Sequence, residues 1–143
     1  MRTAAVIYLQ KLLKSYLQEG SGRTAVRADC VLIGEDLLIV LSGEGQHIGG
    51  CSFAEPYMSK ESKSATVSSI SRKEHQDIEM TRLVAQEVAK QLGVVVIAIG
   101  GIHIENATKE EIKQILGNAR SLSDRLINAV AANLHLKRER HLV

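Results

Sequence analysis

The chain is poor in aromatic residues, which make up 3% of its 143 positions, and it contains no tryptophan. Tyr8, Tyr16, Phe53 and Tyr57 are too few for a surface that stacks nucleic-acid bases one after another. Neither sign of charge is in large excess. The chain has 18 Lys and Arg and 16 Asp and Glu, which gives a formal net charge of +2. This balance does not favour nucleic acid or an anionic membrane as the main partner.

Cysteines and long apolar runs are equally scarce. Cys30 and Cys51 make neither a disulfide framework nor a zinc motif, and we expect them to be buried thiols in a reducing compartment. No stretch approaches the roughly 20 apolar residues of a membrane span. The longest apolar run near the N-terminus, residues 4–9, is too short for the core of a secretory signal. These absences favour a cytoplasmic protein without a membrane partner.

The length is typical of one domain with a core of its own, and we expect residues 1–143 to form a single domain. Apolar residues at helical spacing over 4–17 predict an N-terminal helix within residues 1–20. The core is expected over residues 23–134. The charged residues 135–143 are expected to form a frayed, solvated tail.

Several short segments rich in β-branched and aliphatic residues predict strands. They are residues 24–33, 37–42, a segment leading into Phe53, 65–70 and the apolar run 94–99. Pro56 is expected to close the third of these strands, and the polar residues 58–64 to form a mobile loop. An unbroken apolar run such as 94–99 is typical of a strand that is covered on both faces.

Two capping-box sequences predict helix starts, S-x-x-E at Ser71 and T-x-x-E at Thr108. The first helix is expected to end at Gly93, and the second carries an apolar stripe as far as Leu134. Strands joined by short turns come first, and a strand between two helices follows. This order indicates an α+β fold with helices packed on a mainly antiparallel sheet, plus the additional N-terminal helix.

The first candidate site is a glycine-rich segment around His47. Gly45 and Gly49 flank this histidine, and bare backbone of this kind lets a ligand or a phosphate approach the amide groups. A plain hairpin turn explains the same glycines. His75, near a predicted helix start, is a second candidate, although a lone histidine at such a position is more often an ordinary surface residue.

The third candidate site joins the buried strand to the capped helix and contains Gly101, His103, Glu105 and Asn106. Loops at the carboxyl end of a buried strand are favoured ligand positions, and the amide groups at the start of a helix suit phosphate. Hydrogen bonds within a turn explain the same residues. A metal site is a further possibility if the fold brings His47, His75 and His103 together, which their spacing leaves open.

The order of these motifs resembles that of the LpdD-like prenylated flavin chaperones, small accessory subunits of gallate-type decarboxylases. The most specific stretch is Gly101 through Ile112, followed by Gly45 through Gly49 with its His-Ile-Gly sequence. His75-Gln76-Asp77 matches more loosely the family's histidine and acidic residue at a helix start, because the expected flanking glycine and lysine are missing. The resemblance covers roughly residues 23–130.

The resemblance implies an α+β fold similar to that of the proteasome assembly chaperones, and a non-catalytic or weakly catalytic accessory protein. Such a protein binds prenylated FMN and helps to mature it or to deliver it to a decarboxylase of the UbiD type. The implied cofactor-binding residues are Gly45, His47, Gly49, His75, Gly101, His103, Glu105 and Asn106. Aliphatic side chains such as Ile48 and Ile102 can pack on a flavin ring, so few aromatic residues are needed.

Two alternative functions stay open at this point. A ligand-free protein-assembly chaperone would use its sheet and its N-terminal helix as the interface. A small metal-dependent enzyme would use the three histidines of the candidate sites. The long apolar stripe of the last helix and the additional apolar helix leave surface to cover, which predicts a homodimer.

Overall fold

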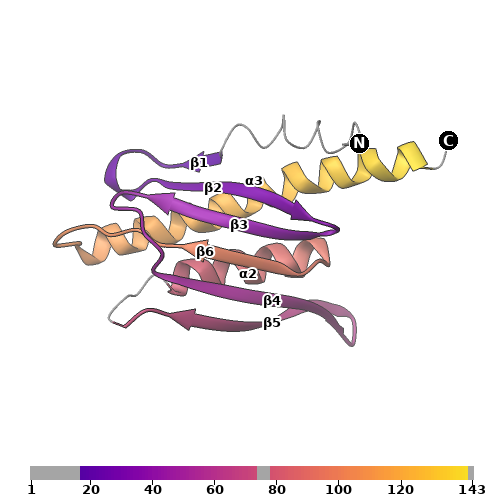
Figure 1. Ribbon diagram of the computed structural model, residues 1–143, viewed down its shortest axis with the longest axis horizontal. Helices are drawn as coiled ribbons and strands as arrows, with labels where there is room; N and C mark the ends of the chain where they lie inside the picture. The colour runs from indigo at the N-terminus through magenta and orange to yellow at the C-terminus, as the bar shows by residue number, and fades with distance from the viewer. Residues whose placement is uncertain (1–16, 74–77, 142–143) are drawn as a thin grey trace.

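The described part of the protein is a sheet with its two α-helices on one side (Figure 1). The computed structural model describes residues 17–73 and 78–141, with side chains as far as Asn133. Six strands follow the order β1-β2-β3-β6-β4-β5. The two α-helices of the described residues, α2 (Ile78–Leu92) and α3 (Lys109–His141), lie on the same face of the sheet (Figure 1). The predicted α+β class is confirmed.

The sheet is mixed rather than wholly antiparallel. Its strands are β1 (Leu17–Glu19), β2 (Val26–Ile33), β3 (Asp36–Gly43), β4 (Gly50–Ser59), β5 (Ser62–Ser71) and β6 (Val96–Gly100). Every neighbouring pair is antiparallel except β3 and β6, which are parallel. The prediction of a mainly antiparallel sheet therefore needs one correction. β6 enters the sheet after the crossover through α2 and inserts between β3 and β4, and parallel neighbours require a crossover of this kind.

The predicted N-terminal helix over residues 1–20 is wrong at its C-terminal end. Leu17–Glu19 form β1, which pairs with β2 at the edge of the sheet, and residues 1–16 lie outside the described residues. Arg125 of α3 holds this edge strand, since its Nη1 donates to the carbonyl oxygen of Gln18 and forms an ion pair with Glu19 at 2.9 Å. Pairing with β2 overrides the helical spacing of the local sequence.

Pro56 does not end its strand. β4 continues to Ser59 and pairs with β5 along its whole length, so the loop predicted over 58–64 is a tight turn between two ten-residue strands. Ala54 is the last residue of β4 that pairs with β6. Pro56 therefore lies beyond the neighbouring strand on that side, where a missing N–H breaks no ladder hydrogen bond.

The helix boundaries also differ from the sequence prediction. Ser71 is the last residue of β5 rather than a helix cap, and the described part of α2 begins at Ile78. Gly93 ends α2 as predicted, with φ +67° and its N–H bonded to the Ala89 carbonyl. The backbone of α3 continues past the predicted end at Leu134 to His141, through residues that are mostly strong helix formers.

The core lies between the sheet and the two helices. Alternate residues of each strand point into it, as the burial of Val26, Ala28 and Cys30 along β2 illustrates. Leu122 of α3 and Val84 of α2 are fully buried against this layer. Among the described helices, none combines the length and apolar character needed to cross a membrane.

Candidate functional site

Two loops meet at one end of the sheet. Residues 44–49 connect β3 to β4, and residues 101–108 connect β6 to α3. Because β3 and β6 are parallel neighbours, their carboxyl ends lie at the same end of the sheet. The backbone joins the two loops directly, since the N–H of His103 donates to Glu44 O at 3.0 Å and that of Gly49 to Gly100 O at 3.0 Å. The first and third segments chosen from the sequence thus form one site.

Gly45 makes this close approach possible. Its φ is +53°, in the left-handed region, and a Cβ atom at this position would collide with the carbonyl oxygen of His103. A non-glycine residue would therefore meet both backbone strain and a steric clash. The neighbouring Gly101 contributes its carbonyl oxygen, which accepts a hydrogen bond from His47 N at 3.4 Å. The loop–loop contact therefore requires a glycine at position 45.

His47 and His103 face each other across the two loops. Their ring centroids are 6.3 Å apart and the ring planes are nearly perpendicular, at 81°. Nδ1 of His47 lies 3.0 Å from the carbonyl oxygen of Gly45. Because a carbonyl oxygen only accepts, we assign the ring proton of neutral His47 to Nδ1, which makes Nε2 the acceptor nitrogen. The imidazole of His47 is half-buried and that of His103 is exposed.

Glu105 and Asn106 shape the turn into α3. Asn106 has φ +54°, a left-handed conformation that asparagine tolerates. Nη2 of Arg23, in the short 3-10 helix η1 (Gly22–Thr24), donates to the carbonyl oxygen of Glu105 at 3.0 Å. The side chains of Glu105 and Asn106 are exposed at the surface. Arg23 was not among the residues chosen from the sequence, and no motif marks it, because its role depends on a contact between distant segments.

The predicted capping box at the start of α3 is confirmed. Thr108 N donates to Glu111 Oε2 at 3.0 Å, and Glu111 N donates to Thr108 Oγ1 at 3.1 Å. The hydrogen bond from the Thr108 backbone lowers the pKa of Glu111, and nearby Arg23 lowers it further. Glu110 and Glu111 also place two carboxylates in the first turn. This helix start is therefore a poor place for a phosphate, contrary to the expectation from its amide groups alone.

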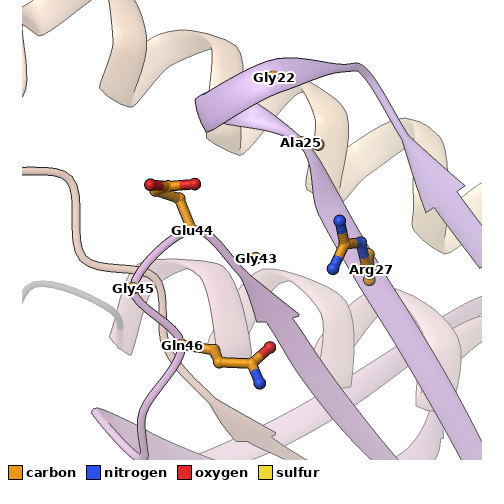
Figure 2. A pocket seen from close by; sticks show the side chains of 7 residues that line it. All are labelled: Gly22, Ala25, Arg27, Gly43, Glu44, Gly45 and Gln46. Carbon is orange, nitrogen blue, oxygen red and sulfur yellow. The ribbon is translucent and has the colours of Figure 1, made fainter.

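A pocket of about 410 Å³ opens beside the histidine loops, between the start of β2 and the β3–β4 loop. Its lining residues are Gly22, Ala25, Arg27, Gly43, Glu44, Gly45 and Gln46. Figure 2 shows Arg27 and Gln46 on opposite sides of this pocket, with Gly43 between them. Nε of Arg27 donates to Gln18 Oε1 at 3.0 Å, which orients the guanidinium. The sequence did not single out Arg27, since an alternating strand pattern gives no sign that its arginine borders a pocket.

The structure describes two of the three histidines of the predicted metal site, His47 and His103. His75 lies in residues 74–77, outside the described residues. Within 17–73 and 78–141, no group of three or more His, Cys, Asp or Glu residues is arranged to hold a metal ion. His47 and His103 are therefore two neighbouring imidazoles without a third described ligand.

The fold and the site define a small α+β protein in which a pocket of ligand size adjoins a pair of histidines at the end of its sheet. The family model of the prenylated flavin chaperone LpdD-like domain matches residues 20–131, which are 112 of the 143 residues. The chain belongs to this LpdD-like prenylated flavin chaperone family. A search of curated proteins finds no matching relative. The matched region includes both loops, the pocket and most of α3.

Proposed function

We propose that this protein binds prenylated FMN at the end of its sheet and helps to mature it or deliver it to a UbiD-type decarboxylase. The observation that carries this proposal is the pocket bounded by Arg27 and Gly45, which adjoins the His47–His103 pair in a chain of the LpdD-like family. Its volume of about 410 Å³ lies within the range of pockets that bind small molecules and cofactors.

The residues present fit a flavin nucleotide. The guanidinium of Arg27 supplies charge-assisted hydrogen bonds for the phosphate. Gly43 and Gly45 leave backbone without side chains beside it, and the exposed carboxylate of Glu44 can accept hydrogen bonds from sugar-chain hydroxyls. His47 and His103 would reach the flavin ring from the two neighbouring loops, whose backbone contact includes Gly49 and Gly101.

Bound prenylated FMN supplies the chemistry of the decarboxylase, and this chain's own residues bind and orient it. The exposure of Glu44, Gly45 and Gln46 leaves the pocket open to solvent on one side, which suits a protein that must release its ligand. Among the residues chosen from the sequence, Glu105 and Asn106 act in this proposal by shaping the turn next to His103. His75 stays a candidate ligand-binding residue.

We also propose that the protein works in the cytoplasm and forms a homodimer. Its partner protein is the decarboxylase subunit. Cys30 and Cys51 are both free thiols, and free thiols are typical of a reducing compartment. The ligand-free assembly chaperone differs from this proposal in one observable. It would bind the decarboxylase equally well with and without prenylated FMN.

The phosphate position is tested by anaerobic titration of the protein with prenylated FMN and with the same flavin after enzymatic removal of its phosphate. We expect the phosphorylated ligand to bind at least tenfold more tightly, and Arg27→Ala to abolish this preference, as the loss of a charge-assisted hydrogen bond would. Arg120→Ala, which changes an exposed arginine of α3 away from the pocket, is the matched control. An unchanged preference in Arg27→Ala would contradict the proposed site.

A further inference from the structure

Gln18 of the edge strand β1 contacts the arginine that borders the pocket. Its Oε1 accepts the hydrogen bond from Nε of Arg27 at 3.0 Å, and the two residues are direct cross-strand partners. A second hydrogen bond runs from Nε2 of Gln18 to the carbonyl oxygen of Gly20 at 3.1 Å. Because a carbonyl oxygen only accepts, the amide nitrogen must face Gly20, and this leaves the amide oxygen toward Arg27.

The backbone of Gln18 is held from the helix layer. Nη1 of Arg125, on α3, donates to the carbonyl oxygen of Gln18 at 2.6 Å and forms the ion pair with Glu19. β1 also pairs with β2 over all three of its residues. The side chain of Gln18 therefore extends from a fixed backbone position, and its amide can hold the guanidinium of Arg27 in one place.

The arginine needs such a contact because its side chain is long and exposed. Arg27 lies on the exposed side of β2, at the border of the pocket (Figure 2). Fixing a side chain with many rotamers at the moment of binding costs free energy. A hydrogen bond that already holds the guanidinium before the ligand arrives lowers this cost, and the lower cost favours a ligand that the guanidinium binds directly.

The neutral amide of Gln18 orients the guanidinium without compensating its charge. A carboxylate at position 18 would accept the same hydrogen bond, but it would also form an ion pair with Arg27 and weaken the attraction for phosphate. The neighbouring carboxylate, that of Glu19, pairs with Arg125 instead. Successive side chains of a strand point to opposite faces, so Gln18 and Glu19 act on different sides of the sheet.

Gln18 lies outside the part of the chain that the family model matches. The match covers residues 20–131, which include every residue that lines the pocket. β1 ends at Glu19, before the match begins. The contact between Gln18 and Arg27 is therefore a feature of this chain that its family membership does not supply.

We propose that Gln18 is a positioning residue for phosphate recognition, an inference that rests on the proposed function because it takes the phosphate of prenylated FMN as the group that Arg27 binds. The amide of Gln18 holds the guanidinium of Arg27 in the orientation that receives the phosphate. Gln18 thereby sets how strongly the protein prefers the phosphorylated flavin. β1 becomes part of the ligand-binding end of the sheet.

The phosphate preference, defined as the ratio of the dissociation constants of the dephosphorylated and the phosphorylated prenylated flavin, tests this role. Gln18→Met keeps the length of the side chain and removes the acceptor. We expect it to lower the preference about three- to fivefold and to leave the affinity for the dephosphorylated flavin nearly unchanged. A purely structural role would weaken both ligands equally. Gln91→Met is the matched control, since Gln91 is an exposed glutamine near the C-terminal end of α2, outside the pocket lining.

Two failures are distinguishable in this titration. An unchanged preference in Gln18→Met, with Arg27→Ala still abolishing it, would overturn the role of Gln18 and leave the proposed function standing. A natural chain without any phosphate preference would overturn both.

Exchange of the Arg27 Nε–H with water, measured by NMR in the flavin-free full chain, tests the positioning directly. Arg27→Lys identifies the signal, because lysine has no such group. We expect slower exchange in the natural chain than in Gln18→Met. Gln18→Glu should keep the exchange slow and yet lower the phosphate preference, because its carboxylate compensates the charge of Arg27. Equal exchange rates in the natural chain and Gln18→Met, or an undiminished preference in Gln18→Glu, would overturn the proposal.

Discussion

Single residues decide whether the two site loops can touch. Gly45 and His103 were both chosen from the sequence, and the structure places the backbone of one against the carbonyl of the other. The sequence identified Gly45 because glycines bracket a histidine there, and His103 because its segment joins an apolar strand to a capped helix. It missed Arg23 and Arg27, whose roles arise only when segments distant in the sequence meet.

Gly45→Ala should destabilise the protein by about 1–3 kcal/mol and weaken flavin binding, because the new Cβ would meet the His103 carbonyl at a positive φ. Gly34→Ala is the matched control. Gly34 also has a positive φ, of +63°, but nothing lies within 4 Å of the added Cβ. Urea unfolding of both variants separates backbone strain from the loop–loop clash. Equal losses in the two variants would mean that the contact with His103 is unimportant.

Glu111 makes the stability depend on acid pH. Its pKa in the folded protein lies below the usual value of 4.5, chiefly because its carboxylate accepts the Thr108 N–H. A lowered folded-state pKa means that this stabilisation is present above pH 4.5 and is lost as pH falls through the folded-state value. Glu111→Gln should reduce the dependence of the free energy of unfolding on pH in the acid range. Glu110→Gln should leave this dependence unchanged. Urea unfolding between pH 3 and 7 measures the difference, and parallel profiles for both variants would contradict the assignment.

Cys30 should be chemically inert in the folded protein. Burial raises its pKa to about 12, and the charge of Asp29 contributes in the same direction, so the reactive thiolate is absent at neutral pH. In a Cys51→Ser background, we expect iodoacetamide at pH 8 to leave Cys30 unmodified until urea unfolds the chain. Mass spectrometry measures the modification. Rapid modification without urea would contradict the prediction and would show that the core around β2 opens locally.

At the scale of elements, helices are fixed to the sheet by a few buried polar contacts as well as by apolar packing. Ser69 of β5, Ser52 of β4 and Thr81 of α2 form a chain of hydroxyl contacts at 2.9 Å each. Thr81 Oγ1 donates to the Ile78 carbonyl, so the hydroxyl of Ser52 is the donor to Thr81. This chain fixes the position of α2 over β4 and β5.

Thr81→Val should cost about 1–3 kcal/mol of stability, since it leaves the buried Ser52 hydroxyl without its acceptor. Thr66→Val, on the exposed side of β5, should change stability by less than about 0.5 kcal/mol. Thermal unfolding of the two variants makes the comparison. A loss in Ser52→Ala that simply adds to the loss in Thr81→Val would show that the two hydroxyls are not coupled.

For the molecule as a whole, periodicity was enough to predict the α+β class, the strands β2 and β3, the strand β6 and the long helix α3. The expectation that β6 is covered on both faces was wrong, because both α-helices of the described residues lie on one face and Ile97 and Ile99 on the other are only half-buried. Periodicity was not enough where segments distant in the sequence determine whether a residue lies in a strand and how that strand pairs. Pro56 is tolerated within β4 because the neighbouring strand β6 ends before it. Leu17 lies in a strand because the edge of β2 is available for pairing. β6 runs parallel to β3 because it inserts between β3 and β4. The site followed the same rule, because its loops were predicted separately and the sheet order brought them together.

The central claim, that this chain carries prenylated FMN in the sheet-end pocket, is tested most directly by native mass spectrometry with an absorbance scan. The sample is the protein co-produced with a flavin prenyltransferase, together with its His103→Ala and Arg120→Ala variants. We expect a retained prenylated-FMN mass in the natural chain and in Arg120→Ala, and its loss in His103→Ala. A ligand-free mass for the natural chain, or a flavin retained equally in His103→Ala, would contradict the account.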